Sequence, residues 1–199
     1  MPFPNVPEKR DHAAVVSPEK TAEYDREQGW YPDEDPPDGV VVCHQNELFE
    51  RIVEEDAGRK IPLDDSTFQF YLFEDDPQMG VVGDFGIGAP EGVYVLERLI
   101  EFGVDSFVVA ELCGCFQPDI DLGDIVVCSK AIRDEGTSYH YVEPSKFAYP
   151  DEALRATIEE TLGDVTHHVG PSITTDAFYR DTPIEIEQYQ SEGILSIEM

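Results

Sequence analysis

Apolar and polar residues alternate along the chain with two periods, and the two patterns follow one another in turn. Short apolar runs bounded by Gly, Pro or Asp are typical of buried strands, whereas apolar residues three and four positions apart indicate amphipathic helices. Strands are expected at 40–43, 67–73, 80–84, 106–110, 124–131, 165–170 and 194–199, and helices at 17–28, 45–55, 90–102, 151–162 and 183–192. Ser17 is the expected N-cap of the first helix, and Gly103 closes the third. This alternation predicts an α/β fold with a largely parallel central sheet.

The first 38 residues differ in composition from the rest of the chain. They are rich in acidic residues and in proline, which interrupts long helices. We therefore expect an acidic, proline-rich arm over residues 1–38 and one α/β domain over residues 39–199.

The chain is strongly acidic along its whole length. It has 13 Lys and Arg against 43 Asp and Glu, which gives a formal net charge of −30. Such a chain repels nucleic acids and anionic membranes, so neither is expected as a partner. The even spread of the acids favours adaptation to molar salt, in which charges are screened beyond about 3 Å. An ordinary acidic protein is the alternative.

The sequence carries no sign of a membrane span or of secretion. No apolar run approaches the roughly 18 residues of a span, and the N-terminus has no apolar signal-peptide core. A cytoplasmic protein is therefore expected. The four cysteines, Cys43, Cys113, Cys115 and Cys128, form no C-x-x-C pair. We interpret them as free, buried thiols and expect no metal site.

The strand–glycine–helix segment at 80–102 is the best argument for a different class, an NAD-binding domain. Gly86, Gly88 and Gly92 resemble a dinucleotide fingerprint, and Glu111 follows the next strand, where a ribose-binding acid would lie. The glycine spacing is wrong, however, and Pro90 lacks an N–H group that would help to hold a pyrophosphate. NAD binding is therefore kept as a minor alternative.

An ordered series of motifs extends from Gly86 to the end of the chain. It comprises Gly86-Ile-Gly-x-Pro90, Gly114, Gln117-Pro-x-Ile120, Gly123-Asp124, Arg133-Asp-Glu-Gly-Thr-Ser138, Thr174-Thr-Asp-x-Phe-Tyr179 and Gly193-Ile-Leu-x-Ile-Glu-Met199. In order and spacing this series resembles the nucleoside phosphorylase family of uridine phosphorylases and hexameric purine nucleoside phosphorylases. The resemblance implies a phosphorylase/hydrolase-like three-layer α/β/α fold with a mixed central sheet.

The resemblance also implies a reaction. Members of that family are pentosyltransferases of nucleoside catabolism and salvage, in which inorganic phosphate attacks the anomeric carbon of a ribonucleoside and the base leaves. The transition state resembles an oxocarbenium ion. Implied partners are a nucleoside, either uridine or a purine nucleoside, and phosphate as co-substrate, with no other cofactor. A homo-oligomer, either a dimer or a trimer of dimers, is also implied.

The base and ribose side of the family's site falls on His12, Gly88, Cys113, Gly114, Phe178, Tyr179, Glu198 and Met199. Phe178 and Tyr179 would stack on or wall the base, with ordinary core aromatics as the alternative. Gly114 would permit close approach of the ring. Glu198 and Met199 would border the ribose, and His12 resembles a histidine that reaches a neighbouring subunit's site.

The phosphate side of the site matches poorly. The family's arginines fall on Leu48, on Val109 and near Ser66, and a small Gly-Thr pair falls on Glu111-Leu112. Each missing arginine removes charge-assisted hydrogen bonds worth about 1.5–3 kcal/mol each. No phosphate-binding or catalytic residue is therefore assigned. A degenerate homologue that binds nucleosides or forms oligomers without catalysis is the alternative to an active enzyme.

The resemblance further implies a strand and a closing helix beyond Met199, including the second glutamate of a Glu-Met-Glu motif. We therefore expect either a truncated phosphorylase or a diverged relative that is stabilised by oligomerisation.

Overall fold

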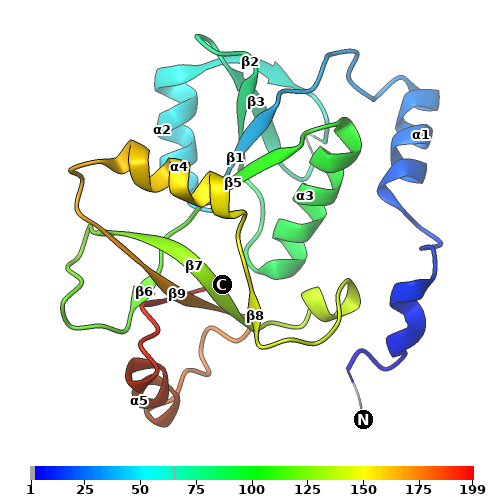
Figure 1. Cartoon of the computed structure of the whole chain (residues 1–199). Helices are drawn as coiled ribbons and strands as arrows, with labels where there is room; N and C mark the ends of the chain where they lie inside the picture. Colours follow the sequence, from blue (N-terminus) through cyan, green and yellow to red (C-terminus); the bar gives the residue numbers. More distant parts are fainter. Residues whose placement is uncertain (1–2, 65) are drawn as a thin grey trace. The chain divides into compact units, whose positions relative to one another are not determined.

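The computed structural model describes residues 3–64 and 66–199, which form two compact units (Figure 1). The N-terminal unit spans Asp11–Leu112, and the C-terminal unit combines Cys113–Met199 with the N-terminal residues up to Arg10. Each unit contains one five-stranded sheet, here called sheet A and sheet B. In the described part of the chain, no helix has the length and apolar character needed to cross a membrane.

Sheet A is a mixed sheet with the strand order β2-β3-β4-β1-β5. Its elements are α1 (Pro18–Gln28), β1 (Gly39–Cys43), α2 (Asn46–Asp56), β2 (Ala57–Ile61), β3 (Gln69–Phe73), β4 (Met79–Gly83), α3 (Ala89–Phe102) and β5 (Ser106–Ala110). Strand β1 pairs in parallel with β4 and β5, whereas β2, β3 and β4 pair antiparallel. Helix α3 carries the chain back from the end of β4 to the start of β5, so β5 runs in the same direction as β4 and β1.

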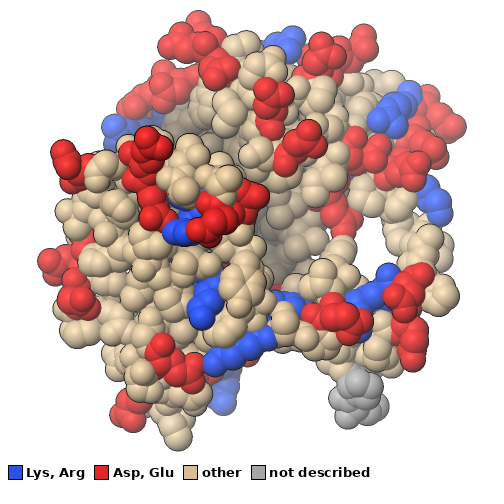
Figure 2. Space-filling view, in the orientation of Figure 1, with Lys and Arg blue, Asp and Glu red and all other residues tan. Residues whose placement is uncertain are grey.

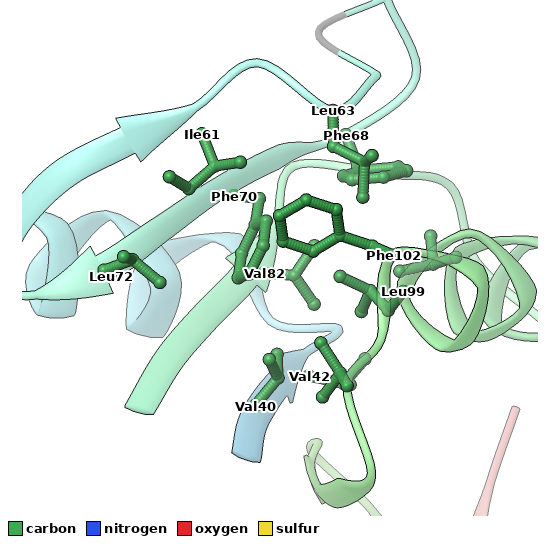
Figure 3. Close-up of a cluster of buried hydrophobic side chains, with 12 residues drawn as sticks. Val40, Val42, Ile61, Leu63, Phe68, Phe70, Leu72, Val82, Leu99 and Phe102 are labelled. Carbon is green, nitrogen blue, oxygen red and sulfur yellow. The ribbon is translucent and has the colours of Figure 1, made fainter. Parts of the chain in front are cut away.

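Helices cover both faces of sheet A, because side chains along a buried strand alternate between its faces. Val40 and Val42 pack in one core with Leu99 and Phe102 of α3 (Figure 3). Cys43, on the opposite face, packs with Phe49 of α2. The expected α/β/α layering is therefore confirmed within this unit.

Sheet B is also mixed, with the strand order β6-β10-β9-β7-β8. Its unit contains η1 (Pro7–Asp11, which runs into the N-terminal unit), β6 (Gly114–Cys115), β7 (Ile125–Asp134), η2 (Ser138–His140), β8 (Phe147–Ala148), α4 (Glu152–Leu162), β9 (His167–Thr175), α5 (Pro183–Ser191) and β10 (Ser196–Glu198). Strands β7, β9 and β10 are parallel, and β6 and β8 pair antiparallel at the edges. Ile186 and Tyr189 of α5 cover a core formed by Phe116, Ile132, Ile173 and Ile194.

The expected helices and strands are confirmed to within a few residues, including two of their ends. Ser17 accepts a hydrogen bond from the Lys20 N–H at 3.4 Å, and Gly103 closes α3 in the left-handed conformation at φ 116°. The structure differs in its sheets, because the described strands form two mixed sheets and not one largely parallel sheet. Residues 111–113 lie in no strand, and β6 pairs with β10 instead of continuing sheet A.

The prediction that the cysteines are buried is wrong for two of them. All four are free thiols, but only Cys43 is buried, Cys128 is half-buried, and Cys113 and Cys115 are exposed. The reason is that Cys115 lies in β6, a two-residue strand at the edge of sheet B, which has no neighbour on its outer side.

Acidic side chains are dispersed over the face seen in Figure 2, and basic side chains are far fewer there. This agrees with the even spread of acids along the sequence. Adaptation to molar salt itself stays a prediction.

Candidate functional site

The parallel strands β7, β9 and β10 end at the same edge of sheet B, here called the carboxyl edge of sheet B. Loops that follow parallel strands gather at such an edge, which is why ligands bind there in many α/β proteins. Phe178 and Tyr179 follow β9, and Glu198 and Met199 end β10. With the first residues of the β6 segment, six of the eight predicted site residues belong to this edge: Cys113, Gly114, Phe178, Tyr179, Glu198 and Met199.

Antiparallel pairing of β6 with β10 brings distant parts of the sequence together. Gly114 lies opposite Ile197, so Cys113 and Glu198 occupy neighbouring positions at the carboxyl edge. A Cβ atom on Gly114 would lie 3.1 Å from Cγ2 of Ile197, closer than ordinary packing. Glycine therefore eases the close approach of the two strands here, whereas its role in the approach of a ligand stays a prediction.

Phe178 and Tyr179 are exposed, so the interpretation of these residues as core aromatics is wrong. Their side chains are 63% and 92% exposed, and the rings meet edge-on with centroids 5.0 Å apart. A planar ligand stacked on these rings would remove from water the apolar area that they now expose, which favours binding. The pair is therefore available to a flat aromatic molecule such as a nucleobase.

A hydrogen bond joins the segment after β7 to the segment that carries these rings. The backbone N–H of Gly136 donates to Oδ2 of Asp176 at 2.7 Å. Before it, the buried Arg133 donates from Nε to Ser138 Oγ at 2.8 Å, and the buried Glu135 accepts from the Ser138 N–H at 2.8 Å. The motif of residues 133–138 was part of the resemblance, but its sequence predicted no such contact. A charged run directly after an apolar strand could have indicated it, since charges that become buried must be paired.

Carboxylates crowd the space between β7, β9 and α5. The pKa of Asp134 is raised by partial burial and then by the negative charges of Glu185, Asp176 and Asp181. The pKa of Tyr189 is raised by burial and then by acidic neighbours, of which Asp134 contributes most. The cavity here has a volume of about 10 Å³, which admits one water molecule. It is lined by Phe116, Asp134, Ile173, Thr175, Asp181, Glu185, Ile186, Tyr189 and Ile197. A nucleobase would not fit in it, so any base would bind on the outer surface of the edge.

Replacing Asp134 with asparagine should stabilise the protein at neutral pH. A carboxyl pKa raised by folding means that its stabilising protonated form is lost as pH rises above the ordinary carboxyl range near 4. The Asp134→Asn variant should therefore melt at a higher temperature than wild type at pH 7. Its free energy of unfolding should rise by less than about 1 kcal/mol, because solvent screens a carboxylate that is only partly buried. The gain should shrink in molar KCl. Thermal melts at low and high KCl measure both effects, and an unchanged or lower melting temperature at low salt would contradict the argument.

Gly88 and His12, the other two predicted site residues, belong to the N-terminal unit. Gly88 is the N-cap of α3 at φ 89°, a conformation that favours glycine, and His12 is exposed. His44, just after β1, lies 4.8 Å from the Phe85 ring, and burial lowers its pKa. Its Nδ1 atom is buried without a hydrogen-bond partner among the described residues. Both His44 and Gly88 lie near the first turn of α3, since a Cβ on Gly92 would meet Cε1 of His44 at 3.3 Å.

The positions at which arginines were expected do not supply other cations. Leu48 in α2 is 39% exposed, Val109 in β5 is 55% exposed, and Ser66 donates to Oδ1 of Asp64 at 2.8 Å. Arg180 is exposed. Within residues 3–64 and 66–199, no group of three or more His, Cys, Asp or Glu side chains is arranged to hold a metal ion.

Known proteins resemble this chain in both sequence and structure. A guanosine phosphorylase of Halorubrum lacusprofundi is 35% identical over 116 residues, which are 57% of this chain and 48% of the relative. A uridine phosphorylase of Thermococcus kodakarensis is 40% identical over 97 residues, which are 47% of this chain and 35% of the relative. The alignments thus span about half the length of these relatives or less.

The crystal structure of uridine phosphorylase from Vibrio fischeri ES114 superposes on this structure with a TM-score of 0.75 and 26% sequence identity. The superposition covers 85% of this chain and 72% of that chain. A family model described as the phosphorylase superfamily matches residues 39–199, which is most of the sequence. The mixed α/β fold, the order of the motifs and this match agree: the chain belongs to the phosphorylase superfamily.

Proposed function

We propose that this chain binds a ribonucleoside, either uridine or a purine nucleoside, and cleaves it with inorganic phosphate to the free base and ribose 1-phosphate. The single observation that carries the proposal is the pairing of β6 with β10. It gathers Cys113, Gly114 and Glu198 at the edge from which Phe178 and Tyr179 project. An aromatic wall beside a carboxylate suits a base and the hydroxyl groups of a ribose. The relatives named as uridine and guanosine phosphorylases support the same class of substrate.

A second candidate function is nucleoside binding without phosphorolysis. It is favoured by the exposed Val109 and by Glu111, which stand where the family's arginine and small residues are expected. Phosphate that approaches an acidic protein without arginine clamps gains few charge-assisted bonds. Both candidate functions use the same residues to bind the base and the ribose, and they differ only in whether the bound nucleoside is cleaved.

Phosphorolysis with uridine, inosine, adenosine and guanosine in molar KCl separates the two candidates. The expected result is release of the free base that requires phosphate and scales with its concentration. Calorimetry with the same nucleosides in the absence of phosphate measures binding alone. Binding without base release would overturn the phosphorylase proposal and support the second candidate, whereas absence of both would overturn the two together.

Replacing Phe178 with alanine should weaken nucleoside binding about tenfold, because stacking a base on an aromatic ring is worth about 1–3 kcal/mol. The matched control is Tyr149→Ala, which removes another exposed aromatic side chain of the C-terminal unit. Calorimetric Kd values for both variants check the prediction. Equal losses for the two variants would mean that Phe178 does not contact the base.

Several other features remain proposals of the same kind. They are a homo-oligomer, a cytoplasmic location, adaptation to molar salt and a role in nucleoside salvage. The even distribution of acids supports the salt adaptation and also supports the proposal that nucleic acids and membranes are not partners.

A further inference from the structure

Residues Phe3–Arg10, here called the N-terminal strap, lie against residues 136–143, which follow β7 (Figure 1). The Phe3 ring meets the rings of Tyr139 and His140 edge-on, with centroid distances of 6.1 and 5.2 Å. The side chain of Pro4 is fully buried. The strap is therefore packed onto the C-terminal unit and does not run free in solvent.

Polar contacts hold the other end of the strap. Lys9 Nζ lies 3.1 Å from Nδ1 of His140. Arg10 donates to the Tyr139 carbonyl at 3.0 Å and to Oε1 of Glu143 at 2.8 Å, and its side chain is only 10% exposed. These contacts bridge more than 120 residues of sequence, so they exist only in the folded protein.

The segment under the strap is tied directly to the candidate site. A Cβ atom on Gly136 would lie 3.6 Å from Cζ of Phe3 and 3.4 Å from Oδ2 of Asp176, and the Gly136 N–H donates to that same oxygen. Asp176 begins the segment that carries Phe178 and Tyr179. Gly136 thus lies beside both the strap and the base of the aromatic segment.

We propose that the N-terminal strap positions the segment 176–181 through residues 136–143. Phe3, Lys9, Arg10 and His140 are positioning residues, which act on Phe178 through Gly136 and Asp176. The role in nucleoside binding rests on the proposed function, whereas the ordering of segment 176–181 does not.

Amide hydrogen exchange of the full chain tests the proposal. Removal of residues 2–9 should lower the protection of residues 176–181 about tenfold relative to wild type. Lys9→Met, which removes the ammonium beside His140, should lower it by less, because the contacts of Arg10 remain.

Lys20→Met is the matched control, because Lys20 is an exposed lysine that bonds to the Val15 carbonyl in the N-terminal unit. It should keep the wild-type protection. The proposal is overturned if removal of the strap leaves protection of 176–181 unchanged, or if Lys20→Met lowers it as much as Lys9→Met does. Nucleoside Kd values measured in parallel should rise in the variants that lose protection. If wild type binds no nucleoside, the proposed function fails while the exchange data still decide the role of the strap.

Discussion

Replacing Phe70 with alanine is expected to lower the free energy of unfolding by about 4 kcal/mol. The Phe70 ring is 0% exposed and lies between β3 and α3, where it meets the Phe102 ring edge-on at 6.2 Å (Figure 3). Gly80 of β4 leaves the space that the ring fills, since a Cβ there would lie 2.8 Å from Cε2 of Phe70. Strands and helix cannot collapse onto the vacated volume without losing their own hydrogen bonds, so most of the cavity remains.

Denaturant unfolding in molar KCl measures this effect. The control is Ile100→Ala, which also shortens an apolar side chain but at a position of α3 that is 58% exposed. It should cost less than about 1 kcal/mol, because little apolar surface returns to water. A loss below about 1.5 kcal/mol for Phe70→Ala would mean that the core collapses around the smaller residue.

Replacing Asp25 with asparagine is expected to cost about 3 kcal/mol, because it removes the nearest negative charge from a buried guanidinium. Arg98 of α3 is 4% exposed and donates to Oδ2 of Asp25 in α1 at 2.7 Å. Its other polar contacts are longer, to the Leu63 carbonyl at 3.3 Å and to Oδ2 of Asp64 at 3.8 Å. The bond also joins α1 to α3, as does the longer ion pair of Arg26 with Glu101 at 3.5 Å, so α1 should fray when the bond to Asp25 is lost.

The control for this variant is Glu27→Gln, which removes the same charge from an exposed position of the same helix. Both variants lower the net negative charge equally, so any difference between them reports the contact with Arg98. Glu27→Gln should change the free energy of unfolding by less than about 0.5 kcal/mol. The loss in Asp25→Asn should persist in molar KCl, because a buried pair is screened much less than exposed charges. A loss that vanishes in high salt would show that the pair acts as a surface salt bridge.

Periodicity predicted most helices and strands well because the core faces of this fold are regular. Val40 and Val42 alternate with residues on the other face, and the apolar positions of 90–102 recur at helical spacing up to Gly103. Strand β2 was missed because Ala57–Ile61 is mostly exposed and polar, with only Ile61 buried. It forms by pairing with β3, and such pairing leaves no apolar pattern in the strand itself.

The order of the motifs led to the correct superfamily. It also led to the proposal that Phe178, Glu198 and their neighbours form the site, which stays a prediction, but it left open whether the aromatic rings are buried. Burial depends on what packs against a side chain, and nothing in the described structure covers Tyr179 beyond one edge-on ring. The link from Gly136 to Asp176 was likewise invisible, since a backbone donor has no signature in the sequence.

The sequence by itself determined the class of the fold, the superfamily and the acidic surface, because each depends on patterns that local residues carry: alternation, motif order and charge. Only the tertiary structure decided which strands pair, which cysteines are exposed and that Phe3–Arg10 folds back onto residues 136–143. Those features depend on contacts between segments far apart in the chain, and their free energies come from the partner as much as from the residue itself. The pairing of β6 with β10, on which the proposed nucleoside site rests, is of this second kind.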